Sequence, residues 1–164
     1  MGLFDDVLAA NADYAASFVD EGLEGQAARG LAVVTCMDSR IDPLKMLGLA
    51  KGDAKIMRNA GGRVTEDVLR TLALATHLLG VNRVLVVEHT ECKMATGTAE
   101  EVHRGIFAAS GIDTRSLDFQ LMDDQLQSLA HDVQKVRSSP YLPAGVEVGG
   151  FLYDVRTGRL REVL

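Results

Sequence analysis

Residues 31–40 have the sequence Leu31-Ala32-Val33-Val34-Thr35-Cys36-Met37-Asp38-Ser39-Arg40. The segment begins as an unbroken apolar run with β-branched residues, which is typical of a central parallel strand covered on both faces. It ends in a thiol, a carboxylate and a guanidinium, at Cys36, Asp38 and Arg40. We therefore expect a buried strand that delivers reactive side chains to one edge of a sheet.

A second segment repeats this pattern further along the chain. The apolar run Val84-Leu85-Val86-Val87 leads into Glu88-His89-Thr90-Glu91-Cys92. Ligands of open parallel sheets bind beyond the carboxyl ends of the strands, so two neighbouring strands of this kind would bring their terminal side chains together. The side chains expected to converge are Cys36, Asp38, His89 and Cys92.

These side chains suit a single zinc ion. Two thiolates and one imidazole form a common zinc ligand set, and a carboxylate or a water molecule can fill the fourth position. Two thiolates cancel the charge of the ion, and the ion in turn keeps both thiols deprotonated. Cys36 and Cys92 are the only cysteines, and the alternative interpretation is a pair of buried, unreactive thiols.

Asp38 has two candidate partners in this arrangement. With Asp38 on the ion, the site is closed; with Asp38 paired to Arg40 through a bidentate contact, the fourth position is open to water. The spacing of Asp38 and Arg40 therefore predicts a switch between a closed and an open site. In a simpler interpretation, the two charges only stabilise their loop.

The rest of the chain alternates strand and helix patterns, which predicts an α/β fold with a mostly parallel sheet. We treat residues 1–164 as a single domain. Strands are expected at 31–34, 54–57 and 84–87, with a strand and turn in the tail. Helices are expected after Asp42-Pro43, from Thr65 to Gly80, over 98–109 and over about 122–137.

Residues 1–22 are assigned to an N-terminal helix. Its apolar residues recur at helical spacing, with acidic residues largely off the apolar stripe. They are Leu3, Phe4, Val7, Leu8, Tyr14, Ala15 and Phe18. Because this helix precedes the first strand, it is a candidate to pack on a partner subunit rather than on its own sheet.

Composition excludes several classes of function. The formal net charge of −6 argues against general binding to nucleic acid or to an anionic membrane. No apolar run approaches the ~20 residues that span a bilayer. The acidic N-terminus lacks the basic region of a secretory signal, so we expect a cytoplasmic protein.

Three motifs in order resemble the signature of the β-class carbonic anhydrases. They are Cys36-x-Asp38-Ser39-Arg40, Arg58-Asn59-Ala60-Gly61 and His89-x-x-Cys92. The resemblance implies a parallel sheet with one antiparallel edge strand, flanked by helices. It also implies a homodimer, often paired into a homotetramer, with the active site at the dimer interface.

The same resemblance implies the chemistry. One zinc per chain would be held by Cys36, His89 and Cys92, with Asp38 as fourth ligand in the closed state only. Asp38 and Arg40 would form the catalytic dyad. The activity would be that of a carbonate dehydratase, the reversible hydration of carbon dioxide to bicarbonate and a proton by zinc-bound hydroxide.

The chain departs from the family pattern at two positions near the predicted ligands, and two other functions are possible on the same ligand set. Glu88 and Lys93 stand where the family often has glycine, which puts the shape of the pocket and the rate in doubt rather than zinc binding. A zinc hydrolase of carbonyl sulfide or carbon disulfide would use identical ligands on the same scaffold. A non-catalytic zinc protein is the third candidate, although a purely structural site needs neither Asp38 nor Arg40.

Overall fold

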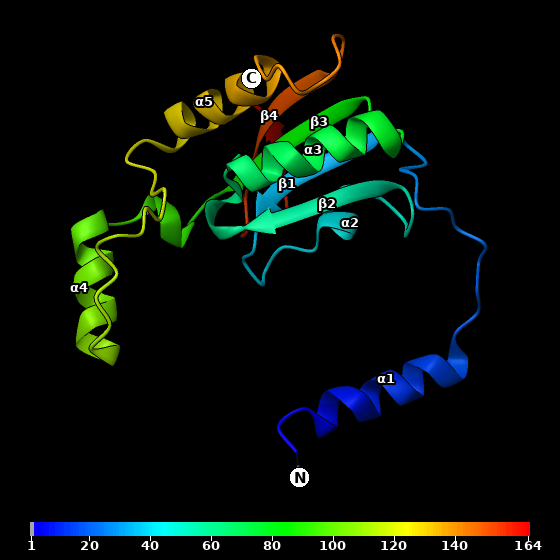
Figure 1. The fold of residues 1–164 in the computed structure, drawn as a ribbon, viewed down its shortest axis with the longest axis horizontal. Coiled ribbons are helices and arrows are strands. Elements are labelled where there is room, and N and C mark those ends of the chain that lie inside the picture. The colour runs from blue at the N-terminus through cyan, green and yellow to red at the C-terminus, as the bar shows by residue number, and fades with distance from the viewer. Residues whose placement is uncertain (1) are drawn as a thin grey trace.

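One β-sheet organises the molecule. The computed structural model describes residues 2–164, and its sheet has five strands in the order β2-β1-β3-β4-β5. Figure 1 labels β1 to β4 of this sheet. Strands β1 to β4 are parallel, and β5 pairs antiparallel with β4 at one edge. Their bounds are Leu31–Cys36 (β1), Ala54–Asn59 (β2), Arg83–His89 (β3), Glu147–Tyr153 (β4) and Leu160–Glu162 (β5). The predicted fold class is therefore confirmed.

Helices lie before and between these strands, and some of them cover the sheet. Their bounds are Asp5–Ser17 (α1), Pro43–Met46 (α2), Glu66–Leu78 (α3), Ala99–Ser110 (α4) and Gln125–Arg137 (α5), with short 3-10 helices at Ala60–Gly62 (η1) and Lys93–Ala95 (η2). The carboxylate of Asp124 accepts a hydrogen bond from the backbone N–H of Gln127 and so caps α5. This cap explains why α5 begins at Gln125 rather than at the expected position near residue 122.

The central strand β1 is buried along its whole length. Its side chains alternate between the two faces of the sheet. Ala32 and Val34 belong to the core that β1 shares with α3 and α5, whereas Leu31 and Val33 pack on the other face with residues that include Met46 of α2. Figure 1 shows α3 and α5 on one side of the sheet and α2 on the other. This double coverage fixes the strand ends that carry the candidate site.

Helices α1 and α4 stand apart from this core (Figure 1), and neither contains a buried residue. An extended stretch joins α1 to β1. The helix α1 lies inside the predicted span of residues 1–22, of which Met1 is outside the described residues. None of the helices among residues 2–164 is both long and apolar enough to cross a bilayer.

Candidate metal centre

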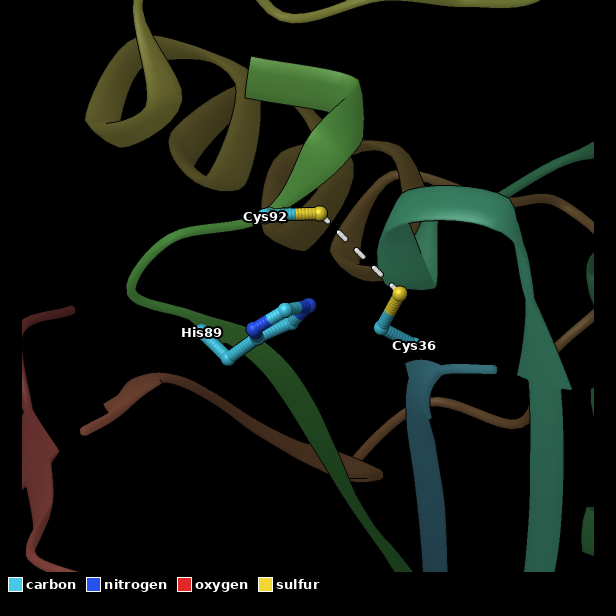
Figure 2. A group of neighbouring side chains, drawn as sticks. All are labelled: Cys36, His89 and Cys92. Atoms are coloured by element: carbon cyan, nitrogen blue, oxygen red, sulfur yellow. Dashed lines mark hydrogen bonds between the residues drawn. The ribbon is translucent and has the colours of Figure 1, made fainter. Parts of the chain in front are cut away.

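Three predicted ligands meet at the carboxyl edge of the sheet. Cys36 and His89 are the last residues of β1 and β3, which are neighbours in the sheet, and Cys92 follows in the turn before η2. Their ligand atoms all lie within 4.8 Å of one another. Figure 2 shows the two sulfur atoms and the imidazole of His89 pointing toward a common centre.

This geometry fits a tetrahedral zinc ion. The two Sγ atoms are 4.0 Å apart, and Zn–S bonds of ~2.3 Å at the tetrahedral angle place two sulfurs about 3.8 Å apart. Nδ1 of His89 lies 2.8 Å from the carbonyl oxygen of Thr90. A carbonyl can only accept, so Nδ1 carries the proton and Nε2 keeps a free lone pair. Nε2 is buried without a hydrogen-bond partner among the described residues, as expected for a metal ligand.

The two thiols behave as a coupled pair. Their mutual hydrogen bond is the main reason why the pKa of Cys36 falls well below its usual value, while the pKa of Cys92 rises. Burial lowers the pKa of His89, but the nearby Cys36 sulfur, the Thr90 carbonyl and the charge of Asp38 together outweigh it, and the net shift is upward. One proton shared by two buried sulfurs is readily displaced by a divalent cation, which favours the thiolate form of both.

Asp38 lies beside this cluster rather than in it. Its Oδ2 is 3.9 Å from Nε2 of His89, and both of its oxygens are bound by Arg40. Nε of Arg40 donates to Oδ1 at 3.0 Å, and Nη2 donates to Oδ2 at 2.8 Å. These hydrogen bonds hold the pKa of Asp38 well below its usual value. The arrangement corresponds to the open form of the predicted switch.

Arg58 fixes the backbone that carries these residues. Its Nε donates to the carbonyl oxygen of Cys36 at 3.0 Å, and its Nη2 donates to the carbonyl oxygen of Asp38 at 2.7 Å. The motif that contains Arg58 was noted in the sequence, but its contacts with this loop could not be predicted. Such contacts depend on the pairing of β1 with β2, which places Cys36 beside Asn59.

Gly62 brings η1 close beneath the site. Its φ of 70° is in the left-handed region, and a Cβ at this position would lie 3.0 Å from both the backbone N of Cys36 and the carbonyl carbon of Thr35. Glycine is needed here for its conformation and for its small size. The close approach is to the end of β1, so Gly62 supports the ligand-bearing strand.

The two departures from the family pattern are in different environments. Lys93 is exposed. Glu88 is completely buried, and neither of its carboxyl oxygens has a hydrogen-bond partner among residues 2–164. Burial is the main cause that raises the pKa of Glu88 to about 8, although Arg63 opposes the shift. Below a pH of about 8, Glu88 is therefore a protonated, uncharged residue of the core. It adds no negative charge to the candidate metal site in that range.

Comparison with known proteins gives a consistent result. A family model described as "Carbonic anhydrase" matches residues 31–136. The chain is 36% identical over 163 residues to β-carbonic anhydrase 1 of Mycobacterium tuberculosis, covering 99% of each chain. The crystal structure of carbonic anhydrase from Streptococcus mutans superposes with a TM-score of 0.92 at 38% identity, covering 100% of this chain and 99% of that one. A carbon disulfide hydrolase of Acidianus is 33% identical over 158 residues, covering 82% and 77% of the two chains.

These matches span the strands, the helices and the loops that bring Cys36, His89 and Cys92 together. They confirm the resemblance that the three motifs indicated. The chain belongs to the β-carbonic anhydrase family.

Proposed function

We propose that this protein is a zinc-dependent carbonic anhydrase that catalyses the reversible hydration of carbon dioxide to bicarbonate and a proton. The observation that carries the proposal is Asp38. Its carboxylate is held by Arg40 at the margin of the cysteine and histidine cluster, 3.9 Å from Nε2 of His89. A purely structural zinc site would need no such pair, because its fourth position would be closed by a further ligand.

Cys36, His89 and Cys92 would hold the metal, one ion per chain. Zinc bound there would supply Lewis acidity, which lowers the pKa of water in an open coordination position to about 7. The thiolates provide the charge that retains the cation, and the hydrogen bond of His89 to the carbonyl of Thr90 fixes the orientation of the imidazole.

Asp38 and Arg40 would form the catalytic dyad. Because the pKa of Asp38 is well below its usual value, the carboxylate is a weak base at neutral pH and accepts a hydrogen bond without taking the proton. Its role is then to orient the attacking oxygen toward carbon dioxide. Arg40 keeps the carboxylate charged and in place through its two side-chain hydrogen bonds.

We also infer that the chain works as a homodimer or homotetramer, with α1 packed on a partner subunit and the site at the dimer interface. The support is exposed apolar surface on α1 and the stretch around it. Leu3, Phe4, Val7, Leu8, Tyr14, Phe18 and Val19 are each 48–93% exposed. Surface of this kind on a helix that does not touch its own core indicates a protein interface. The cytoplasmic location expected from the sequence stays a prediction.

A second substrate class comes from the similarity to the carbon disulfide hydrolase of Acidianus. Carbon disulfide and carbonyl sulfide are linear, electrophilic molecules like carbon dioxide, and the same ligands would serve all three. Carbon dioxide is favoured because the named β-carbonic anhydrase matches the chain at higher identity and over its whole length.

Stopped-flow measurement of carbon dioxide hydration, alongside release of hydrogen sulfide from carbon disulfide and carbonyl sulfide, tests the proposal. The zinc-loaded protein is expected to hydrate carbon dioxide and to release little hydrogen sulfide. Asp38→Ala should keep its zinc and lose activity about 100-fold or more, the scale of a lost acid–base or orienting group. Full activity in this variant would reject the dyad, and hydrogen sulfide release as the faster reaction would reassign the substrate.

A further inference from the structure

The contacts of Arg40 extend beyond Asp38. While Nε and Nη2 face Asp38, Nη1 donates to Oε2 of Glu91 at 3.0 Å. Nη2 also lies 3.3 Å from the backbone carbonyl oxygen of Glu91. Every nitrogen of the guanidinium therefore has an acceptor, and Glu91 supplies acceptors to Nη1 and Nη2.

Glu91 reaches Arg40 through an uncommon backbone conformation. Its φ is 57°, and Gln120 is the only other non-glycine residue with positive φ in the described part of the chain. A left-handed conformation is unfavourable for residues with a Cβ and persists where surrounding contacts hold it. Here it presents both the carbonyl oxygen and the carboxylate of one residue to the same guanidinium.

Arg156 holds the other side of the Glu91 carboxylate. Its Nε donates to Oε1 at 2.8 Å and its Nη2 donates to Oε2 at 2.9 Å, a bidentate contact. The loop after β4 that carries Arg156 is tied to the end of β3. The N–H of Thr90 donates to the carbonyl oxygen of Tyr153 at 2.9 Å, and the N–H of Val155 donates to Oγ1 of Thr90 at 3.2 Å. Arg156 is thus fixed relative to Glu91.

We propose that Glu91 and Arg156 are positioning residues that hold Arg40 on Asp38. They would thereby keep Asp38 out of the fourth coordination position of the metal. The proposal rests on the proposed function, because it acts through the dyad. Negative and positive charges alternate along the series Asp38, Arg40, Glu91 and Arg156. Loss of the Glu91 charge would therefore leave Arg40 facing Arg156. Oδ2 of Asp38 lies 3.9 Å from Nε2 of His89. This is close enough for the carboxylate to reach the fourth coordination position once Arg40 releases it.

The expected effect is moderate. The side chains of Glu91 and Arg156 are 44% and 74% exposed, and ion pairs with this exposure contribute little individually. The bidentate geometry and the shared carboxylate make the network stronger than one pair. We expect Glu91→Gln and Arg156→Ala to lower kcat about two- to tenfold, with Glu91→Gln the stronger because it contacts Arg40 directly.

Replacement of zinc by Co²⁺ allows the metal's ligand set to be followed by visible absorption. If Glu91 and Arg156 only stabilised their loop, their loss would leave this absorption unchanged. The visible absorption of Co²⁺ reports its ligand set, so a carboxylate in the fourth position changes the spectrum. Glu91→Gln and Arg156→Ala are expected to keep one metal per chain and to shift the spectrum toward the carboxylate-bound form. The matched control is Arg70→Ala, which breaks an exposed ion pair with Asp67 on α3 and should leave the spectrum and kcat unchanged.

The Asp38→Ala background makes the test specific. Without the Asp38 carboxylate, no carboxylate of this dyad can enter the fourth coordination position, so Glu91→Gln should cause no further spectral change there. A wild-type spectrum and wild-type kcat in both Glu91→Gln and Arg156→Ala would overturn the proposal. A Glu91→Gln shift that persists in Asp38→Ala would also overturn it. If the unaltered protein fails to hydrate carbon dioxide, the proposed function fails while the spectral comparison still decides this inference.

Discussion

The carboxyl edge of the sheet and the N-terminal helix α1 differ in how far one chain buries their side chains. At the edge, Cys36, His89 and Cys92 are almost fully buried, and the contacts that hold their loops come from the same chain. In α1, every residue from Asp5 to Ser17 is exposed. Within one chain, the first region is held by hydrogen bonds such as those of Arg58 and Thr90. The second carries apolar surface that stays exposed within one chain.

The two regions therefore report different things: the strands report where the candidate ligands lie, and α1 reports an apolar surface that is not covered within one chain. Burial of β1 and β3 fixes the positions of the candidate ligands Cys36 and His89, because both strands are covered on both faces. The apolar stripe of α1 is exposed within one chain, so it predicts an interface without identifying the partner. Perturbation of the two regions should therefore change different properties: metal content and activity at the sheet edge, and the state of association at α1.

The largest effect is expected from loss of a metal ligand. Cys92→Ala should reduce bound zinc from about one ion per chain to near zero, because each thiolate supplies both charge and a metal bond. Metal analysis after dialysis measures this. The control is Lys93→Ala, which removes an exposed neighbouring side chain and should keep the zinc. Stoichiometric zinc in Cys92→Ala would contradict the assigned ligand set.

The next effect concerns association through α1. Leu8 is 67% exposed within one chain, so Leu8→Glu should leave the fold of the subunit intact. If α1 packs on a partner, burial of this leucine contributes about 1.5–3 kcal/mol, and the substitution should weaken association roughly 10- to 100-fold.

Sedimentation velocity across a dilution series measures the association of this variant. The control is Asp13→Asn, which changes an exposed acidic residue of the same helix. An unchanged association constant for Leu8→Glu would place the interface elsewhere on the molecule.

A smaller effect on stability is expected at Gly62, where η1 meets β1. A Cβ there would meet the backbone of Cys36 and Thr35 at 3.0 Å, in addition to the cost of its left-handed φ. Gly62→Ala should lower the free energy of unfolding by about 2–4 kcal/mol. Gly111→Ala is the matched control, because Gly111 has a φ of 72° with nothing within 4 Å. It should cost only about 1–2 kcal/mol, and equal losses in the two variants, measured by denaturant unfolding, would show that the close approach is unimportant.

Per unit of pH, the smallest expected effect is the pH dependence of stability caused by Glu88. Its pKa is raised from 4.5 to about 8 in the folded protein, chiefly by burial. Between these values the folded chain keeps a proton that the unfolded chain releases, so stability falls as pH rises, by up to about 1.4 kcal/mol per pH unit.

Glu88→Gln cannot release this proton and should lose that part of the slope. The difference in unfolding free energy between Glu88→Gln and the unaltered protein, measured from pH 5 to 8, isolates it from the titration of the ligands. A difference that stays constant with pH would contradict a neutral Glu88.

Much of the fold was predictable because local patterns and burial agree. The apolar runs at 31–34 and 84–87 gave the central strands, and Thr65 gave the start of α3. The strands nevertheless extend to Cys36 and His89, beyond the ends of the apolar runs. Both final residues are buried. The neighbours of Cys36 come from segments far apart in the chain, so its burial depends on packing rather than on hydrophobic pattern.

The contacts around the candidate site were less predictable. Nothing in the local sequence distinguishes Glu91 and Arg156 from ordinary surface charges, and they lie far apart in the chain. They meet because β3 and β4 are parallel neighbours, with His89 opposite Tyr153 in the register. The pairing of strands, a long-range property, decides which loops can exchange hydrogen bonds.

The sequence by itself determined the chemistry on offer: two thiols, an imidazole and an Asp38-x-Arg40 pair at the ends of two apolar strands. The tertiary structure decided that Asp38 is bound to Arg40 rather than placed among the ligands. It also decided that Glu88 is buried and that α1 is not. The physical reason is that residue type fixes what a group can bind, whereas its charge state and its partner depend on neighbours brought together by folding.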